Sequence, residues 1–196
     1  MASMLGSGSD ADRARVVGQV TAFLKVRPTF LCPEVPTDPV LAGKAWASPR
    51  SWTNAIDVLA QLRPDDEDAA LMAVRGCVGD AAAMEFFAWL ASADLHDPEE
   101  VMDNPSIVEW ANERPDRLFA LVSGVTTLTL ARGDKDTWRK GVNVLVACAE
   151  GKRPDVALHS ARVLLALEKE MGGAPRAAVA AFGDIFGKIG RFETAA

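Results

Sequence analysis

The chain has 196 residues, with 21 basic and 27 acidic side chains, a net charge of −6 and 49% apolar residues. That length suits one ordinary domain or two small ones, and the composition is typical neither of a disordered chain nor of a collagen. The acidic balance argues against a dedicated nucleic-acid binder, which needs a basic face to neutralise phosphates.

The sequence carries no sign of secretion or membrane insertion. No stretch approaches about 18 uninterrupted apolar residues, and the start, MASMLGSGSD, lacks a charged segment followed by an apolar one. Cys32, Cys77 and Cys148 are far apart and form no C-x-x-C pair, which argues against a disulfide framework and a structural zinc site. We therefore expect a cytoplasmic protein with three buried or half-buried thiols.

The chain is predicted to be helical almost throughout, because it holds 33 alanines and little of the alternation typical of strands. Residues 1–9 are rich in glycine and serine and are expected to be a flexible leader or a tag. Asp10 or Asp12 can cap a first helix that ends before Pro28. The proline-broken residues 29–47 form the longest irregular segment, which is typical of a functional loop or a wrapped connector.

Ser48 and Pro49 are predicted to begin the next helix, as a hydroxyl N-cap followed by proline at the first helical position. Pro64 ends it. The acidic run 65–68 then precedes another helix, where negative charge suits the positive end of the helix dipole; a cation site is the alternative. Gly79 restarts the chain into a helix whose core stripe is predicted to contain Met84, Phe87, Leu90 and Ala91, widened by Phe86 and Trp89.

Residues 96–100 resemble a group of metal ligands at first sight, but a capping box explains them. Asp97 is the predicted N-cap, Pro98 the first helical residue and Glu100 the reciprocal partner. A short helix containing Trp110 is expected to begin at Asn104 and Pro105. A long helix over 115–130 follows, although its threonine-rich last turn has strand propensity.

The last third is predicted as three antiparallel helices joined by short connectors. Gly151 is expected in the left-handed position that closes the first of them. His159 is expected to be a half-buried packing residue rather than a catalyst. The three core stripes are Trp138, Val142, Leu145 and Cys148; Val156, Val163, Leu164 and Leu167; and Val179, Phe182, Ile185 and Ile189. The fold prediction is an all-α antiparallel bundle of about eight helices, in two packed subregions, 10–95 and 96–196.

Sequence signatures of enzymes are absent from the chain. It contains no G-x-S-x-G and no H-E-x-x-H, and its two histidines cannot supply both an acid–base pair and metal ligands. The pair Gly43-Lys44 lacks the upstream glycine and the following hydroxyl residue of a phosphate loop. These absences argue against a self-sufficient hydrolase or phosphotransferase, and we expect no metal site.

The segment from Trp46 to Trp52, WASPRSW, is the one pattern that points to a ligand. Arg50 would lie in the first turn of a helix, beside the positive end of the dipole, where arginine is a poor choice unless an anion binds there. A guanidinium next to free backbone N–H groups suits a phosphate. The alternative is a surface arginine packed on Trp46 or Trp52.

The residues FLKVRP, a proline-broken loop and GKAWASPRSW resemble the end of the nucleotide-binding core and the helical lid of MoxR-like AAA+ ATPases of high-GC bacteria. The resemblance is best over 14–95, including AAAMEFFAWL, and residues 97–196 resemble a C-terminal extension of that group. It implies that Arg50 is the second sensor, which contacts the γ-phosphate of ATP, supported by Trp46, Ser48, Pro49 and Trp52. The family's phosphate loop, acidic metal-binding motif, first sensor and arginine finger have no counterpart in this sequence.

Two functions are therefore predicted. In the first, the chain is a nucleotide-sensing lid and C-terminal region that couples the ATP state of an AAA+ core, or of a neighbouring subunit, to partner proteins. ATP and Mg²⁺ would then bind only together with the core, and the chain alone would hydrolyse no ATP. In the second, it is a helical adaptor or scaffold that binds protein and no nucleotide. Neither function involves nucleic acid or a membrane. An independent small-molecule enzyme is a third, less favoured reading.

Overall fold

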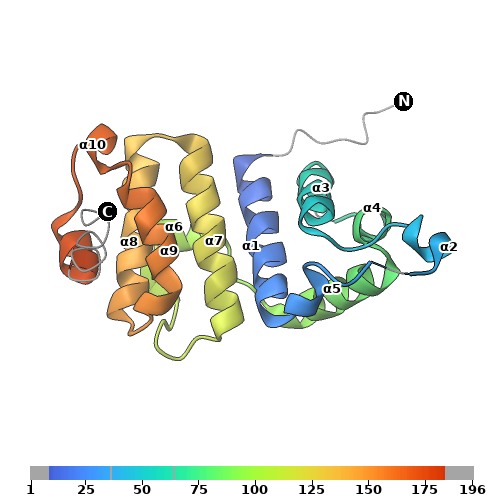
Figure 1. Cartoon of the computed structure of the whole chain (residues 1–196). Coiled ribbons are helices and arrows are strands. Elements are labelled where there is room, and N and C mark those ends of the chain that lie inside the picture. Colours follow the sequence, from blue (N-terminus) through green and yellow to red (C-terminus); the bar gives the residue numbers. More distant parts are fainter. Residues whose placement is uncertain (1–8, 36, 64, 184–196) are drawn as a thin grey trace, which may run out of the picture.

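The computed structural model describes residues 9–35, 37–63 and 65–183, and all regular structure in these ranges is helical (Figure 1). This confirms the all-α prediction. Residues 176–183 are helical as well. The other elements are α1 (Asp10–Val26), η1 (Pro28–Phe30), α2 (Pro39–Ala42), α3 (Pro49–Leu59), α4 (Glu67–Val78), α5 (Asp80–Ala93), α6 (Pro98–Asp103), η2 (Pro105–Ile107), α7 (Pro115–Arg132), α8 (Lys135–Glu150), α9 (Pro154–Leu165) and α10 (Glu168–Met171), where η marks a 3-10 helix.

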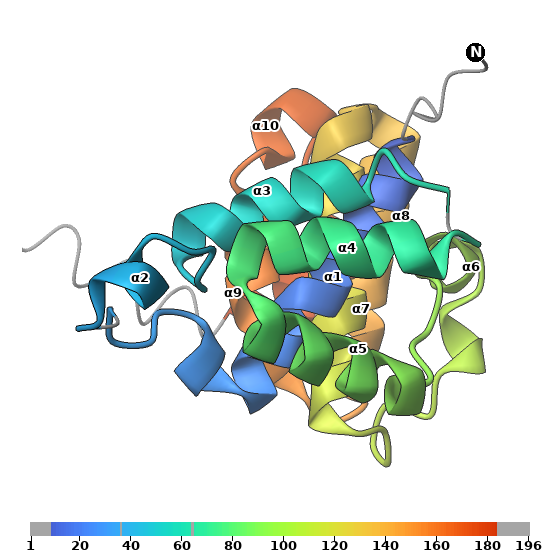
Figure 2. The ribbon, with the colours of Figure 1, turned by 90° about the vertical axis from the view of Figure 1, so that its right-hand side faces the viewer.

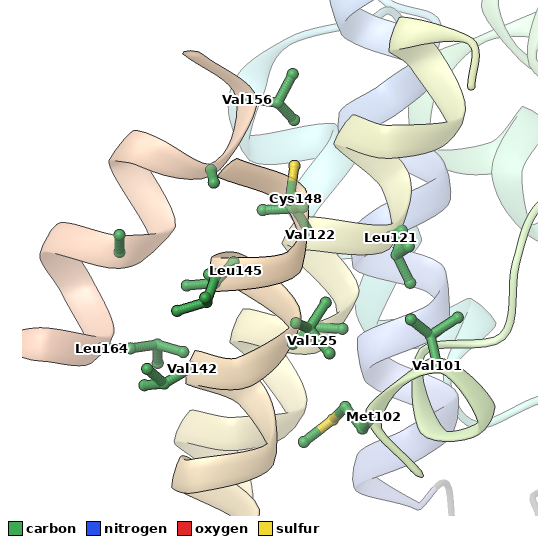
Figure 3. Close-up of a cluster of buried hydrophobic side chains, with 14 of the residues drawn as sticks. Val101, Met102, Leu121, Val122, Val125, Val142, Leu145, Cys148, Val156 and Leu164 are labelled. Carbon is green, nitrogen blue, oxygen red and sulfur yellow. The ribbon is translucent and has the colours of Figure 1, made fainter. Parts of the chain in front are cut away.

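The buried apolar side chains form two clusters. The first lies among α1, α3, α4 and α5 and contains four aromatic residues in mutual contact, Phe23, Trp52, Phe86 and Trp89. The ring of Phe23 lies 5.4–5.9 Å from the centroids of the other three. The second cluster lies among α6, α7, α8 and α9, and Figure 3 shows its aliphatic centre. The clusters follow the two halves of the chain, while the domain boundary at residue 95 stays a prediction.

The two halves meet where α1 and α7 run side by side in opposite directions (Figure 1). Glycines permit this close approach. A Cβ atom on Gly18 would overlap the carbonyl oxygen of Ala120 in α7, and one on Gly124 would lie 3.2 Å from the carbonyl oxygen of Ala14 in α1. Each helix also lends a small side chain to the other half's cluster: Ala14 of α1 packs in the second cluster and Ala120 of α7 in the first. The cores are therefore in direct contact.

The start of α1 needs a correction. Its N-cap is Ser9, not Asp10 or Asp12. The Ser9 hydroxyl accepts from the Asp12 N–H at 3.1 Å, and the Asp12 carboxylate accepts from the Ser9 N–H at 3.2 Å. The two side chains thus satisfy two backbone donors reciprocally. Ser9 is therefore part of the helix start, and only residues 1–8 of the predicted leader lie outside the described residues.

The core face of α5 is predicted correctly only in part. Met84 is 57% exposed and Ala91 is also exposed, whereas Phe86 and Trp89 are buried. Phe87 and Leu90 are half-buried. Nearly every residue of α5 is apolar, so periodicity does not single out one face. The large rings of Phe86 and Trp89 decide the orientation, because they complete the aromatic cluster with Phe23.

The predictions for Gly151 and Trp110 in the second half need correction. Gly151 has φ −71°, and the left-handed residue is Lys152, with φ 65°. Gly151 is needed for space, since a Cβ atom there would overlap the side chain of Trp110. Trp110 itself lies outside any helix, because η2 ends at Ile107. Its indole N–H donates to the Pro105 carbonyl at 3.0 Å, which closes the turn after η2.

Three side chains predicted to be buried or half-buried are exposed: Cys32, His159 and Val179. Val179 is 57% exposed, whereas Phe182 on the same helical segment is fully buried. Ile185 and Ile189 lie outside the described residues. The threonine-rich end of α7 is helical. Thr126, Thr127 and Thr129 each donate a hydroxyl hydrogen bond to the carbonyl four residues earlier, which satisfies these groups within the helix.

Candidate functional site

The turn that carries Arg50 is fixed by two serines. Ser48 is the N-cap of α3 and Pro49 its first residue, as predicted. The Ser48 hydroxyl accepts from the Ser51 N–H at 3.1 Å, and the Ser51 hydroxyl oxygen accepts from the Ser48 N–H at 2.8 Å. The Ser51 hydroxyl lies 3.0 Å from the Trp46 carbonyl, to which it donates. This network holds the start of α3 against the preceding loop.

Arg50 projects from the first turn of α3 and is exposed. Among the described residues, neither its guanidinium nor its backbone N–H has a hydrogen-bond or ion-pair partner. It borders a broad, open hollow of about 400 Å³, together with Lys44, Ser48, Asn54 and Cys77. The guanidinium of Arg50 is thus open to a ligand.

Among the described residues, no cation–π contact joins Arg50 to Trp46 or Trp52. Trp52 is 2% exposed and belongs to the aromatic cluster. Its indole N–H donates to the Phe30 carbonyl at 2.7 Å, which ties the end of η1 to α3. Trp46 is half-buried beside the hollow. Both residues therefore position the start of α3 rather than the guanidinium.

The hollow at the start of α3 suits an anion. It is bordered by two cations, Lys44 and Arg50, and by no acidic side chain. The pKa of Asp80 is lowered mainly by its hydrogen bond with Arg75 and slightly by the charge of Lys44. The positive end of the α3 dipole adds to the same field. A guanidinium, an ammonium and hydroxyl groups are the donor set that phosphate oxygens accept from.

The acidic run at the start of α4 is explained by structure rather than by a cation. Asp66 is the N-cap and accepts from the Ala69 N–H at 3.0 Å. Asp65 forms a two-point ion pair with Arg63, at 2.8 and 3.1 Å. Within the ranges that the structure describes, no three potential ligands gather as they would around a metal ion.

A half-buried polar cluster that sequence reasoning missed lies beside the segment joining the two halves. Glu113, 10% exposed, lies 2.6 Å from His96 Nε2 and 3.3 Å from a guanidinium nitrogen of Arg117. The Arg114 N–H donates to it at 2.8 Å, and Arg153 donates to its carbonyl at 3.2 Å. Burial raises the pKa of Glu113. The hydrogen bonds with His96 and the Arg114 N–H, and the charges of Arg117 and His96, outweigh it and hold the pKa below its ordinary value.

This cluster also corrects the capping box predicted at 96–100. Asp97 is the N-cap of α6 and accepts from the Glu99 and Glu100 N–H groups at 2.8 and 3.1 Å. The reciprocal bond from Glu100 does not form among the described residues. His96 turns instead toward Glu113, 17 residues away in sequence. No sequence signal marks that pairing.

Comparison with protein-family models, with curated proteins and with solved structures gives no match. Within the described ranges, none of the helices combines the length and the apolar character needed to cross a membrane.

Proposed function

We propose that the chain is a nucleotide-sensing helical module of an AAA+ assembly of MoxR type, in which Arg50 contacts the γ-phosphate of ATP held by an ATPase core. The observation that carries the proposal is the exposed, unpartnered Arg50 at the capped start of α3, beside Lys44. Together with the likeness of GKAWASPRSW to the lid of that family, it favours a phosphate contact over a structural role. Magnesium and the attacking water would be held by the core.

The direct test measures ATP contacts in an assembly that contains this chain and an ATPase core. In backbone amide NMR spectra of the isotope-labelled chain within that assembly, Mg²⁺-ATP is expected to shift the amides at the start of α3. Arg50→Ala should reduce these shifts, and Arg50→Lys should restore them only in part, because an ammonium lacks the planar fork. Arg139→Ala is the matched control, since Arg139 is exposed on α8 and unpaired among the described residues.

The second test concerns turnover. The chain alone is expected to release no phosphate from ATP beyond the buffer rate. In an assembly that contains this chain and an ATPase core, Arg50→Ala is expected to impair ATP binding or hydrolysis, because a charge-assisted contact to phosphate is lost. Wild-type turnover by that variant, or ATP-independent spectra at the start of α3, would contradict the sensor role.

A helical adaptor that binds protein and no nucleotide is the second candidate. The observation favouring it is a set of exposed large apolar side chains in the first half of the chain, among them Val40, Met72 and Met84. Flexible methionines are common on protein-binding surfaces. Unchanged spectra with ATP, combined with loss of a partner protein in Met72→Glu but not in Arg50→Ala, would favour the adaptor.

A further inference from the structure

A cleft of about 310 Å³ lies within the first half of the molecule. The helices α1, α3, α4 and α5 surround it: α1 packs against α3 and α5, and α4 packs against the same two. Figure 2 looks onto this side, with α1 visible behind α4 and α5. The cleft adjoins Leu59 and Leu62, at the far end of α3 from Arg50. It is therefore a separate feature from the hollow beside Arg50.

The walls of the cleft are mostly apolar. Phe86 is fully buried beneath it, and Val16 of α1 is also buried. Four large side chains that line it are only half-buried, although each would be expected in a core: Leu59, Leu62, Phe87 and Leu90. They remain partly exposed to solvent because no described segment fills the space between the four helices. Concave apolar sites between the helices of a bundle are typical places for small ligands.

One edge of the cleft is polar and faces inward from α1. Arg15 and Gln19 are one helical turn apart, so they project from the same face. Both line this cleft and also a smaller one, of about 120 Å³, beside His96. Both side chains thus border two adjoining hollows rather than a filled core.

The Arg15 guanidinium is weakly paired. Its described partner is Asp12 at 3.5 Å, and that carboxylate already accepts from the Ser9 N–H and hydroxyl. The amide of Gln19 has no hydrogen-bond partner among the described residues. Arg63, on the opposite rim, is occupied at two nitrogens by Asp65. The donors left for a ligand are thus a guanidinium and an amide, a pair that suits a carboxylate.

We propose that this cleft binds a small amphiphilic carboxylate. The apolar chain of the ligand would lie against Phe86, Phe87 and Leu90, and its carboxylate would accept from Arg15 and Gln19. Glu67 on the rim repels a second negative charge, so a monocarboxylate fits better than a dicarboxylate. The site uses none of the residues assigned to nucleotide sensing and stands whether or not Arg50 contacts ATP.

The test compares decanoate with decanol, which has the same chain and no charge, by calorimetric titration of the full chain below micellar concentrations. The native chain is expected to bind decanoate saturably at one site. Arg15→Gln should weaken decanoate binding by about tenfold, as loss of a charge-assisted bond implies, and leave decanol binding nearly unchanged. The control is Arg13→Gln, which removes the same charge from an exposed position of α1 outside the cleft.

A second variant tests the apolar part of the site. Ala70→Phe places a ring in the cleft from α4 and is expected to abolish binding of both ligands, whereas Ala81→Phe, at an exposed position of α5, should abolish neither. Circular dichroism confirms that each variant is folded. If Ala70→Phe fails to fold, the Arg15 and Arg13 pair still decides. No saturable decanoate binding, equal binding by those two variants, or binding retained in folded Ala70→Phe would overturn the proposal.

Discussion

At the scale of single residues, position matters more than residue type. Arg50 and Arg117 are both guanidinium groups near a helix start, yet Arg50 is exposed and unpartnered, while Arg117 is 18% exposed and lies within reach of Glu113, Asp94 and His96. The first can be removed without disturbing a contact. The second holds together elements from both halves of the chain. This contrast leads to two predictions.

Arg50→Ala is expected to change the free energy of unfolding by no more than about 0.5 kcal/mol, because no described contact is lost. Trp52→Ala, two residues along the same helix, is expected to lower the free energy of unfolding by about 3–5 kcal/mol. It removes one ring from the aromatic cluster and the hydrogen bond to the Phe30 carbonyl. Urea denaturation measures both. A loss of stability in Arg50→Ala similar to that in Trp52→Ala would mean that Arg50 serves the fold.

Glu113 is expected to make the stability pH-dependent under acidic conditions. Its pKa in the folded chain lies below the ordinary value of 4.5, so the ionised form is favoured by folding. The stabilisation is complete above that ordinary value and is lost as the pH falls through the folded pKa. Glu113→Gln should lower stability at neutral pH and flatten the acid decline. Glu109→Gln, at an exposed position nearby, should leave both unchanged in urea titrations from pH 7 to pH 3.

At the scale of helices, the boundaries follow from sequence, but the packing faces follow only in part. Proline after a serine or aspartate predicts the starts of α3 and α6, since these residues leave few orphan N–H groups. In α8 the stripe of Trp138, Val142 and Leu145 is buried as predicted, because polar residues mark the opposite side. In α5 apolar residues surround the helix, so only the partner rings decide the face.

The close contact of α1 with α7 could not be predicted from sequence, because a single glycine in a helix does not indicate which other helix packs against it. Gly18→Ala is expected to destabilise the chain by about 1–3 kcal/mol, since its methyl group would meet the backbone oxygen of Ala120, which cannot move aside. Gly76→Ala in α4, where the added methyl meets nothing within 4 Å, should instead stabilise by about 0.5–1 kcal/mol. Thermal denaturation of both variants separates packing from helix propensity.

At the scale of the whole molecule, the two clusters are expected to unfold together. Ala14 and Ala120 each pack in the cluster of the opposite half. The half-buried Arg117 pairs with Glu113 and lies within reach of Asp94, at the segment between the halves. Opening one half would therefore expose part of the other. Calorimetry should give one transition, with equal calorimetric and van't Hoff enthalpies. Two separated transitions would show that the halves are independent folding units.

The candidate site could be predicted only as far as its local geometry. The start of α3 at Ser48 and Pro49 follows from adjacent residues, because capping is a short-range effect. The residues that border the hollow with Arg50 could not be predicted, since Lys44 reaches it from the irregular segment before α3. The amphiphile cleft was invisible for the same reason: its lining comes from four helices, and its polar pair on α1 reads in sequence as an ordinary solvated face.

The three cysteines differ in burial, so their rates of alkylation can report local opening of the folded chain. Cys32 is exposed, Cys77 is half-buried, and burial raises the pKa of the Cys148 thiol to about 12. Because only the thiolate is nucleophilic, an alkylating reagent should modify Cys32 first and reach Cys148 only when α8 separates from α7 and α9. Mass spectrometry of alkylated peptides over time would then report how often the second cluster opens in the native chain, without any introduced probe.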